Sequence, residues 1–520
     1  MDPFTIISGI EACWKAGDYL MRAYEAWKQA DDKISESFVA IEYVWIKTKL
    51  QIEVMQKVLT PDSEYWKYVE NSASILSGKL WDAISAIDDV IKREPGVGRV
   101  TIKKIKYVLL KETIDKAVRD LEDWQRRFDP SWFLILRAAE DPDRPVGPNL
   151  DDAAITVKNH AGAPKEQNTF ELAKGLLDVT SRPDGDTGVF LPNTNFDISR
   201  IRYSTAVLAR RPASYSKALI LDSIHCDEQA DRDQLTKDVR LLASKLRRVD
   251  PLTFGLLNCR GVMKVDGEKP SFDFVFNTPK GKGKFRSLRE ALLDQSIPSL
   301  SQRLSYAKEL TKSISYMHTF DFVHKNIRPE TILLFNNEDN KRDLTFLVGF
   351  EGFRAVDGAT AQRGDAELHR DLYRHPQRQG EAPGKRYSME HDIYSLGVCL
   401  LEIGLWQSFV AYKAVGDADE PQPGPMRDQY YDWLKRTNRG NPYNPSSYLH
   451  EYFEEQARDT LPQHLGDLYA NIVIKCLTCL NENDDDEYAD VDEANREKPM
   501  IAAGVMFIQD ILLRVDELTI

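Results

Sequence analysis

The sequence lacks any run of about eighteen consecutive apolar residues, so it is not predicted to be made as a membrane-spanning chain. Positive charge is also in short supply, because 69 Lys and Arg stand against 82 Asp and Glu. The formal net charge of −13 argues against nucleic acid as a partner. Cysteine is rare, with 6 residues in a chain of 520, and no secretory leader precedes them. We therefore expect reduced core thiols in a cytosolic protein.

Two of the cysteines, Cys476 and Cys479, have the spacing of a zinc or redox motif, but a second pair is missing. Helical spacing explains both as buried residues, so a metal site is not favoured. The remaining composition, 42% apolar and 29% charged, is ordinary for a globular protein. Because 520 residues exceed a single core, at least two domains are expected.

The most informative motif is residues 323–334, Val-His-Lys-Asn-Ile-Arg-Pro-Glu-Thr-Ile-Leu-Leu. It resembles the catalytic loop of protein kinases, where His-Arg-Asp is followed by four residues and Asn. His324 is kept, but Asn326 stands at the position of the catalytic base, and an amide cannot act as a carboxylate base. Thr331 stands at the metal-binding position, and Arg328 replaces the loop lysine.

A second motif begins eighteen residues after Thr331, where a kinase carries Asp-Phe-Gly. This chain reads Gly349-Phe350-Glu351, so the aspartate that is the main magnesium ligand is missing. Further on, residues 373–377 fall where a kinase activation segment ends, and residues 392–402 resemble the buried central helix of the large lobe. In kinases the aspartate of that helix binds the backbone of the catalytic loop, so the resemblance implies a scaffold role for Asp392.

The expected small lobe departs further from the kinase pattern. No Gly-x-Gly-x-x-Gly loop occurs between Pro192 and Leu221, and the glycine-rich residues 281–284 suit a linker between lobes. The strand at 217–222 ends in Leu221 or Asp222 where a kinase carries lysine, and Lys217 lies at its start. The helix expected at 231–249 contains no glutamate, and strands are expected at 252–265 and 271–278.

From these substitutions the sequence predicts a catalytically inactive pseudokinase that is not an enzyme. It predicts no cofactor and at most weak, metal-independent ATP binding. Two alternatives stay open: an active atypical kinase that recruits metal through Glu351, and a signalling scaffold without membrane activity.

The N-terminal region has apolar residues at helical spacing in four blocks, at about 6–24, 38–59, 76–91 and 105–128. Thr60-Pro61 and Pro95-Gly96 mark breaks between blocks, and short connections favour an up-down four-helix bundle. The opening residues and this bundle look like the HeLo and HeLo-like domains of fungal cell-death proteins. A bundle followed by a kinase-like domain is similar to the mixed-lineage kinase domain-like (MLKL-type) cell-death executioners.

The MLKL-type resemblance implies programmed cell death by membrane permeabilisation. It implies a cytoplasmic protein with conditional recruitment to the plasma membrane, where anionic lipids and self-association are the partners, under an upstream signalling protein. Between residues 92 and 111, seven basic residues face one acid, a local net charge of +6 (7 − 1) that suits anionic headgroups. A solvated helix face and plain core residues are the open alternatives. The candidate membrane contacts are Phe4, Ile6, Ile7, Ile10, Lys103, Lys104 and Lys106.

The predicted fold is therefore multidomain, an all-α four-helix bundle joined to an α+β bilobal protein kinase-like fold. The predicted boundaries are 1–140 for the HeLo-like bundle, 141–195 for a linker or brace, 196–280 for the small lobe and 281–520 for the large lobe.

Overall fold

The computed structural model divides the chain into two compact units, Met1–Asp178 and Val179–Ile520, which are described separately. The first unit is called the helical unit below, and the second the kinase-like unit. The structure describes residues 8–28, 45, 49, 64–90, 187–211, 218–226, 232–267, 270–279, 281, 283–294, 296–320, 322–337, 342–355, 367–380, 387–415, 418–439, 448–480, 511, 512, 514, 515 and 518.

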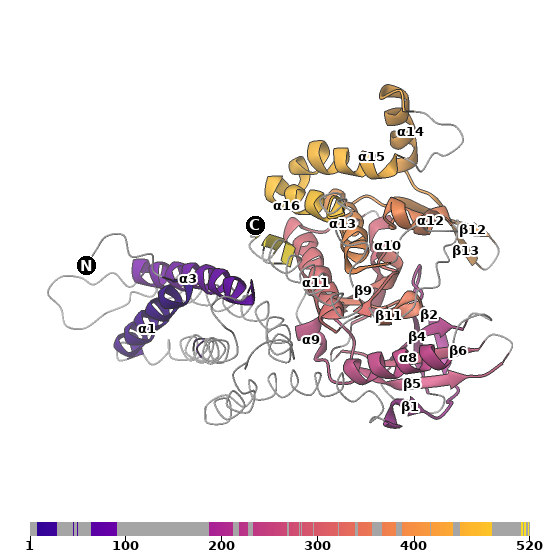
Figure 1. Cartoon of the computed structure of the whole chain (residues 1–520), viewed down its shortest axis with the longest axis horizontal. Helices are drawn as coiled ribbons and strands as arrows, with labels where there is room; N and C mark the ends of the chain where they lie inside the picture. Colours follow the sequence, from indigo (N-terminus) through magenta and orange to yellow (C-terminus); the bar gives the residue numbers. More distant parts are fainter. Residues whose placement is uncertain are drawn as a thin grey trace, which may run out of the picture. The chain divides into compact units, whose positions relative to one another are not determined.

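In the helical unit, α1 (Gly9–Lys28) packs along α3 (Glu64–Val90), as Figure 1 shows. α1 overlaps the first predicted block of apolar residues, whereas α3 begins at Glu64, well before the predicted block at 76–91 that it contains. Apart from Trp45 and Lys49, the second and fourth predicted blocks lie outside the described residues, so the four-helix bundle stays a prediction. Of the helices in the described residues, none is both long and apolar enough to cross a membrane. The buried contact residues include Ile10, Cys13, Ala16, Leu20, Ala73, Leu76, Leu80 and Ile84.

The kinase-like unit begins with a six-stranded sheet in the order β1-β5-β6-β4-β3-β2. Its strands are β1 (Phe190–Leu191), β2 (Asp197–Arg200), β3 (Val207–Arg210), β4 (Leu219–His225), β5 (Cys259–Val265) and β6 (Ser271–Asn277). All neighbours are antiparallel except β1 and β5, which are parallel. β1 lies inside the segment that the sequence assigned to the linker.

One helix, α8 (Arg232–Leu246), lies along the sheet in Figure 1 and agrees with the helix predicted at 231–249. The predicted strand at 252–265 is wrong at its start. Residues Pro251–Phe254 form the short helix α9, because proline at the first helical position favours a helical turn, and the strand begins only at Cys259. Lys217, at the start of the predicted strand, lies outside the described residues.

The second part of the unit is mainly helical, and it carries the catalytic-loop motif between two strands. Residues 281–284, predicted as a linker, lead into β7, which pairs with β9 in a three-stranded sheet. The elements here are β7 (Phe285–Ser287), α10 (Leu288–Leu293), α11 (Leu300–Thr319), β8 (Phe322–Val323), η3 (Pro329–Thr331), β9 (Ile332–Asn337), β10 (Arg342–Leu347), η4 (Phe350–Gly352) and β11 (Arg354–Ala355).

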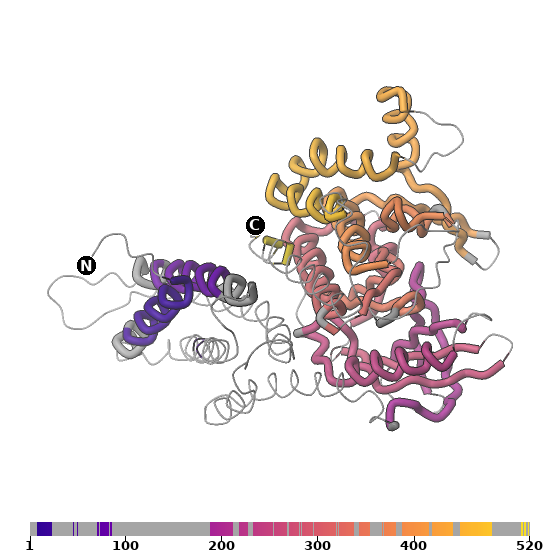
Figure 2. Tube along the Cα trace, viewed as in Figure 1, coloured from indigo at the N-terminus to yellow at the C-terminus, as the bar shows by residue number. Residues whose placement is uncertain are grey.

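The C-terminal part is built around α13 (Met389–Leu405), the predicted central helix. All but two of its residues are buried. Figure 2 shows its tube running beside those of α11 and α16, both of which contact it. The remaining elements are α12 (Leu368–Asp371), η5 (Pro376–Arg378), β12 (Val410–Val415), β13 (Ala418–Pro423), α14 (Met426–Arg436), α15 (Leu449–Glu455), η6 (Gln456–Thr460) and α16 (Pro462–Leu477).

The six cysteines are free thiols. Five are buried, including Cys476 and Cys479 at the end of α16, and Cys226 is half-buried. Burial raises the pKa of Cys259 to about 12, as expected for a thiol that serves as an apolar core residue. Among the described residues, no group of three or more His, Cys, Asp or Glu is placed to hold a metal ion.

A fully buried arginine, Arg289 of α10, ties this part together. Its Nε donates to Glu330 at 2.9 Å, and its Nη1 donates to Glu402 at 2.8 Å. The same Nη1 donates to the hydroxyl of Ser408 at 2.6 Å, and Nη2 donates to the hydroxyl of Tyr373. The Arg289 guanidinium therefore connects α10 with the catalytic loop, with α13, and with Tyr373 in the segment that precedes α13.

The two carboxylates that flank Arg289 respond differently to burial. Burial alone would raise the pKa of Glu330, but the guanidinium groups of Arg289 and Arg328 and the Tyr412 hydroxyl lower it to about 2. Burial raises the pKa of Glu402, because it shares only the one guanidinium. The opposite directions follow from the number of cationic neighbours, which is two for Glu330 and one for Glu402.

Replacing Arg289 by methionine should strongly destabilise the kinase-like unit. Methionine fills similar volume but leaves Glu402 buried without its cation and Glu330 with Arg328 alone, and breaking a buried pair costs about 3–5 kcal/mol. Chemical denaturation of the full chain measures the loss. The control Arg427→Met removes an exposed arginine that pairs with Asp428 at 3.5 Å, and it should change stability by less than about 0.5 kcal/mol. Equal effects of the two changes would contradict a central role for Arg289.

Candidate functional site

Asp392 of α13 binds the backbone of the catalytic-loop motif through its carboxylate. One carboxylate oxygen accepts the backbone N–H of His324 at 2.7 Å, and the other accepts the N–H of Lys325 at 2.9 Å. The Tyr387 hydroxyl also donates to this carboxylate, at 2.8 Å. Burial would raise the pKa of Asp392, but His318 and the hydrogen bond from the His324 backbone lower it. The geometry is the one that the kinase resemblance implied for Asp392, a carboxylate that fixes the loop backbone.

His324 lies in the core of the same loop and is fully buried. Its Nε2 lies 3.1 Å from the carbonyl of Val348, and its Nδ1 accepts the backbone N–H of Asn326 at 3.3 Å. These partners fit the neutral tautomer with the proton on Nε2. Burial lowers the pKa of His324 to about 4, so the ring is neutral near pH 7 and links the loop to the strand before Gly349.

Asn326, at the position of the kinase base, is engaged on both sides of its amide. Its Oδ1 accepts Nε of Arg328 at 2.8 Å. Its Nδ2 donates to the carbonyl of Gly349 and to Oε1 of Glu351, both at 3.2 Å. Glu351 also pairs with Nη1 of Arg370 at 3.2 Å, and its side chain is 29% exposed. A carboxylate therefore lies beside the base position, although it comes from a different segment.

The two metal-binding positions of the kinase pattern do not fit magnesium. Gly349 has no side chain, and its backbone has φ +84°, a conformation that favours glycine. A Cβ atom there would come within 2.2 Å of Thr331 Cγ2. The Thr331 hydroxyl is used inside the loop, 2.8 Å from the carbonyl of Asn326 and 2.9 Å from that of Arg328. We derive no step through magnesium.

Asp222 of β4 stands where the kinase pattern has its strand lysine. It is buried, and its Oδ2 accepts the backbone N–H groups of Gly349 at 2.8 Å and Phe350 at 2.9 Å. Burial raises the pKa of Asp222 to about 6, opposed by these two hydrogen bonds and increased further by the nearby carboxylates Glu351 and Asp273. A buried carboxylate thus lies at the end of the strand where a kinase carries its lysine, and it binds the backbone of the Gly349 segment.

The structure brings together His324, Asn326, Arg328, Thr331, Gly349 and Asp392 from the predicted site. It also adds groups that the sequence did not single out as functional: Arg289, and Asp222 in its role as acceptor for the Gly349 segment. The strand position of Asp222 was visible in the sequence, but its partner was not. Of the candidate membrane contacts, only Ile10 is described, and it is buried against α3. The residues Phe4, Ile6, Ile7, Lys103, Lys104 and Lys106 lie outside the described residues.

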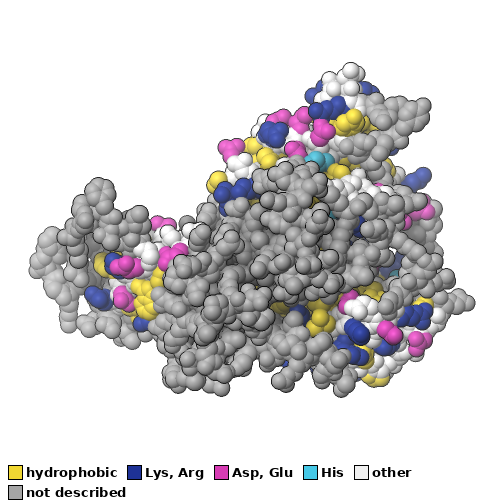
Figure 3. All heavy atoms as spheres, in the orientation of Figure 1, with side chains coloured by type: hydrophobic (Ala, Val, Ile, Leu, Met, Phe, Trp, Pro, Cys, Tyr) yellow, Lys and Arg dark blue, Asp and Glu magenta, His cyan; other side chains and the backbone are white. Residues whose placement is uncertain are grey.

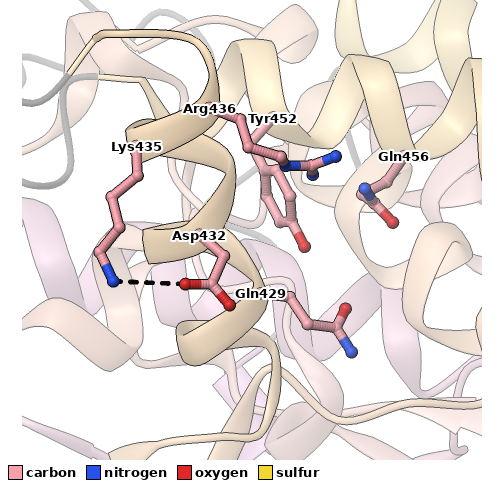
Figure 4. Close-up of a pocket in the computed structure, with 6 residues that line it drawn as sticks. All are labelled: Gln429, Asp432, Lys435, Arg436, Tyr452 and Gln456. Carbon is pink, nitrogen blue, oxygen red and sulfur yellow. Dashed lines mark hydrogen bonds and ion pairs between the residues drawn. The ribbon is translucent and has the colours of Figure 1, made fainter.

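Two further hollows lie around α14 and α15, and neither is lined by catalytic-loop residues. The larger has a volume of about 580 Å³. Figure 4 shows Lys435 paired with Asp432 at its edge, and the hydroxyl end of Tyr452 points between the other labelled side chains. The smaller, about 140 Å³, is mainly apolar and is lined by residues that include Phe409, Met426, Tyr430, Tyr431 and Phe453.

Comparison with known proteins finds kinase relatives. Over 120 residues the chain is 30% identical to mitogen-activated protein kinase kinase mkk2 of Aspergillus fumigatus, covering 23% of this chain and 21% of the relative. Over 174 residues it is 28% identical to mitogen-activated protein kinase kinase 7 of Arabidopsis thaliana, covering 33% and 49%. A Mycoplasma pneumoniae protein, named provisionally as a serine/threonine-protein kinase, is 28% identical over 127 residues, covering 22% and 33%. No family model matches the chain.

These matches, together with the mixed helices and sheets of the second unit, support a kinase-like region in this chain. The chain spans between a fifth and a half of the length of these relatives. They do not address the HeLo or MLKL-type resemblance of the N-terminal region, which stays a prediction.

The prediction that the chain is not an enzyme is contradicted by these matches. All three relatives are named as protein kinases, and this points toward kinase activity. The prediction failed because it counted catalytic side chains at fixed motif positions. It considered Glu351 only as a residue that recruits metal in the alternative of an active atypical kinase, whereas its carboxylate lies 3.2 Å from Asn326 Nδ2.

Replacing Asp222 by asparagine should stabilise the unit at neutral pH but not in acid. The folded pKa of Asp222, about 6, lies above the ordinary value of 3.8, so its contribution to stability is complete below about pH 3.8 and is lost as pH rises through 6. Asparagine keeps an acceptor for the two N–H groups and does not titrate. The stability of the variant minus that of wild type should therefore rise by about 2.4 kcal/mol between pH 4 and pH 8.

Denaturation midpoints at a series of pH values measure this difference. Asp266→Asn is the control, because it makes the same substitution at an exposed position. The same pH dependence in both variants, or a flat difference for Asp222→Asn, would mean that Asp222 is not a buried titrating group.

Proposed function

We propose that the kinase-like unit is an atypical phosphoryl-transfer domain in which Glu351 replaces the missing catalytic base. The observation that carries the proposal is the 3.2 Å hydrogen bond from Asn326 Nδ2 to Glu351 Oε1. It puts a carboxylate within reach of the point where a kinase holds its aspartate. The kinase names of the relatives give the reaction class.

In this proposal, the carboxylate of Glu351 accepts the proton of a substrate hydroxyl as that oxygen attacks the terminal phosphoryl group of a nucleoside triphosphate. The bond from that phosphorus to the bridging oxygen breaks, and the nucleoside diphosphate leaves. Asn326 donates a hydrogen bond to Glu351, and Arg370 forms an ion pair with it. These two contacts hold the carboxylate beside the catalytic loop. Its partial exposure, 29% of the side chain, leaves it open to a substrate from solvent. Asp392 fixes the loop backbone beneath this group and so acts as a positioning residue.

Changing Glu351 to glutamine should lower phosphoryl transfer by about 10²- to 10⁴-fold, because the amide keeps the shape but cannot take a proton. Transfer from labelled ATP to myelin basic protein, and autophosphorylation of the full chain, measure it. Glu367→Gln is the matched control, since Glu367 also pairs with Arg370, at 3.3 Å, and is 55% exposed. Equal turnover in both variants, or none above the blank in wild type, would refute the proposal.

We further propose that the helical unit couples this domain to membranes, in the manner of the cell-death executioners that it resembles. The observation that favours this is an exposed aromatic pair on the packed helices: Tyr19 of α1 is 46% exposed and Trp81 of α3 is 44% exposed. Their ring centroids lie 5.3 Å apart. Hydrophobic side chains are visible on the face of the helical unit in Figure 3. Tyr and Trp favour the boundary between water and lipid because each has an apolar ring and a polar group.

Replacing both Tyr19 and Trp81 by alanine should lower binding of the full chain to vesicles of phosphatidylserine and phosphatidylcholine, and should lower leakage from them. Tyr431→Ala, which removes a similarly exposed tyrosine of the kinase-like unit, is the control. Charge reversal at Lys103, Lys104 and Lys106 should weaken the same binding, most strongly at low salt. Unchanged vesicle binding in both sets of variants would mean that neither the aromatic pair nor the basic residues contact the membrane, and the membrane proposal would fail.

A further inference from the structure

The connection between β2 and β3, residues 201–206, is called the strap below. It lies where a kinase carries the loop that covers nucleotide phosphates, but it contains no glycine. Its two ends are buried, with Ile201 4% exposed and Ala206 fully buried. Between them, Tyr203 has φ +51°, a left-handed conformation that is unfavourable for a tyrosine and is kept only where its contacts hold it.

Three contacts pin the strap to the second part of the unit. The Ser204 hydroxyl donates to the carbonyl of Glu330, in the catalytic loop, at 3.0 Å. The Ser287 hydroxyl, which also caps α10, donates to the carbonyl of Arg202 at 2.7 Å. The Tyr203 ring stacks on the ring of Tyr412 in β12, with centroids 4.3 Å apart and planes 25° apart.

Tyr412 connects the strap to the buried charge network. Its hydroxyl donates to Glu330 Oε1 at 2.8 Å, and the same oxygen accepts from Arg289. A weaker pair at the tip of the hairpin, Arg202 with Asp419 at 3.9 Å, joins the strap to β13. The β12–β13 hairpin thus reaches the strap with both of its strands.

The strap also occupies space beside Gly349. A Cβ atom at Gly349 would lie 3.3 Å from Oγ1 of Thr205. This hydroxyl is buried and lacks a hydrogen-bond partner among the described residues. A polar group without a partner is costly in a site that is permanently closed, and it gains a partner if an oxygen-rich ligand enters.

We propose that the strap is an autoinhibitory closure, locked by the Tyr203–Tyr412 stack, which must detach before a nucleoside triphosphate binds beside Asn326 and Gly349. The identity of the ligand rests on the proposed phosphoryl-transfer function, and the lock itself does not. If only molecules with an open strap bind the ligand, its apparent affinity equals the intrinsic affinity multiplied by the fraction of open molecules. Loss of the stack should therefore open the strap and tighten binding together.

The test uses the full chain with Tyr203→Ala and Tyr412→Ala, which each remove the stack from one side. Tyr412→Phe is the matched control, because it keeps the stacked ring and loses only the hydroxyl bond to Glu330. Hydrogen exchange of peptides over residues 200–207 measures opening, with peptides of β10 as internal reference. Affinity for ATP is measured in parallel by calorimetry.

Both alanine variants should raise strap exchange and tighten ATP binding by about 2- to 10-fold, the range set by one aromatic pair, with a smaller change in Tyr412→Phe. Having two alanine variants guards against a failure of the hairpin to fold in one of them. Unchanged exchange in both would overturn the lock. Faster exchange with unchanged or absent ATP binding would overturn the closure of the nucleotide site. Neither outcome depends on turnover, so failure of the Glu351 proposal is seen separately, as bound ATP that is not consumed.

Discussion

The buried guanidinium of Arg289 is the constraint on which the rest of the kinase-like unit depends. Once α10 carries this charge into the core, Glu330 must lie against it, and that fixes the register of the catalytic loop. Glu402 must face it from α13, and the Tyr373 hydroxyl bridges to Glu402 at 2.8 Å. The Glu330 carboxylate also accepts a hydrogen bond from the Tyr412 hydroxyl, which attaches the β12–β13 hairpin to this network. The stack of Tyr203 on Tyr412 attaches the strap to it. The packing of α10 and α13, the geometry of the catalytic loop and the position of the strap therefore share one electrostatic centre.

Much of this arrangement could be predicted from the sequence. The catalytic loop, the central helix and the helix after β4 were found because each has a motif or a periodicity that belongs to one element type. The role of Asp392 followed from such a motif. By contrast, Pro251 was missed as a helix start, because the apolar residues after it also suit a strand, and only the turn-favouring proline distinguishes the two.

The contacts that define the candidate site could not be predicted in the same way. Asp222 accepts a hydrogen bond from the backbone of Gly349, which lies 127 positions later in the sequence. Arg289 donates to Glu402, which lies 113 positions later. Position-by-position comparison with a motif registers a missing aspartate and a glutamate two residues later, but it does not show that Glu351 lies within hydrogen-bond distance of Asn326. That is why the sequence indicated an inactive protein, whereas the kinase relatives point toward activity.

The central claim is that Glu351 performs at the Asn326 site the task of a catalytic aspartate. An exchange variant that combines Asn326→Asp with Glu351→Gln tests it most directly, because it returns the carboxylate to the loop and removes the substitute. If the account is right, phosphoryl transfer lost in Glu351→Gln is recovered to within about 10-fold of wild type in the exchange variant. Asn326→Asp alone should then add little. An exchange variant that folds, binds ATP and stays as inactive as Glu351→Gln would contradict the account.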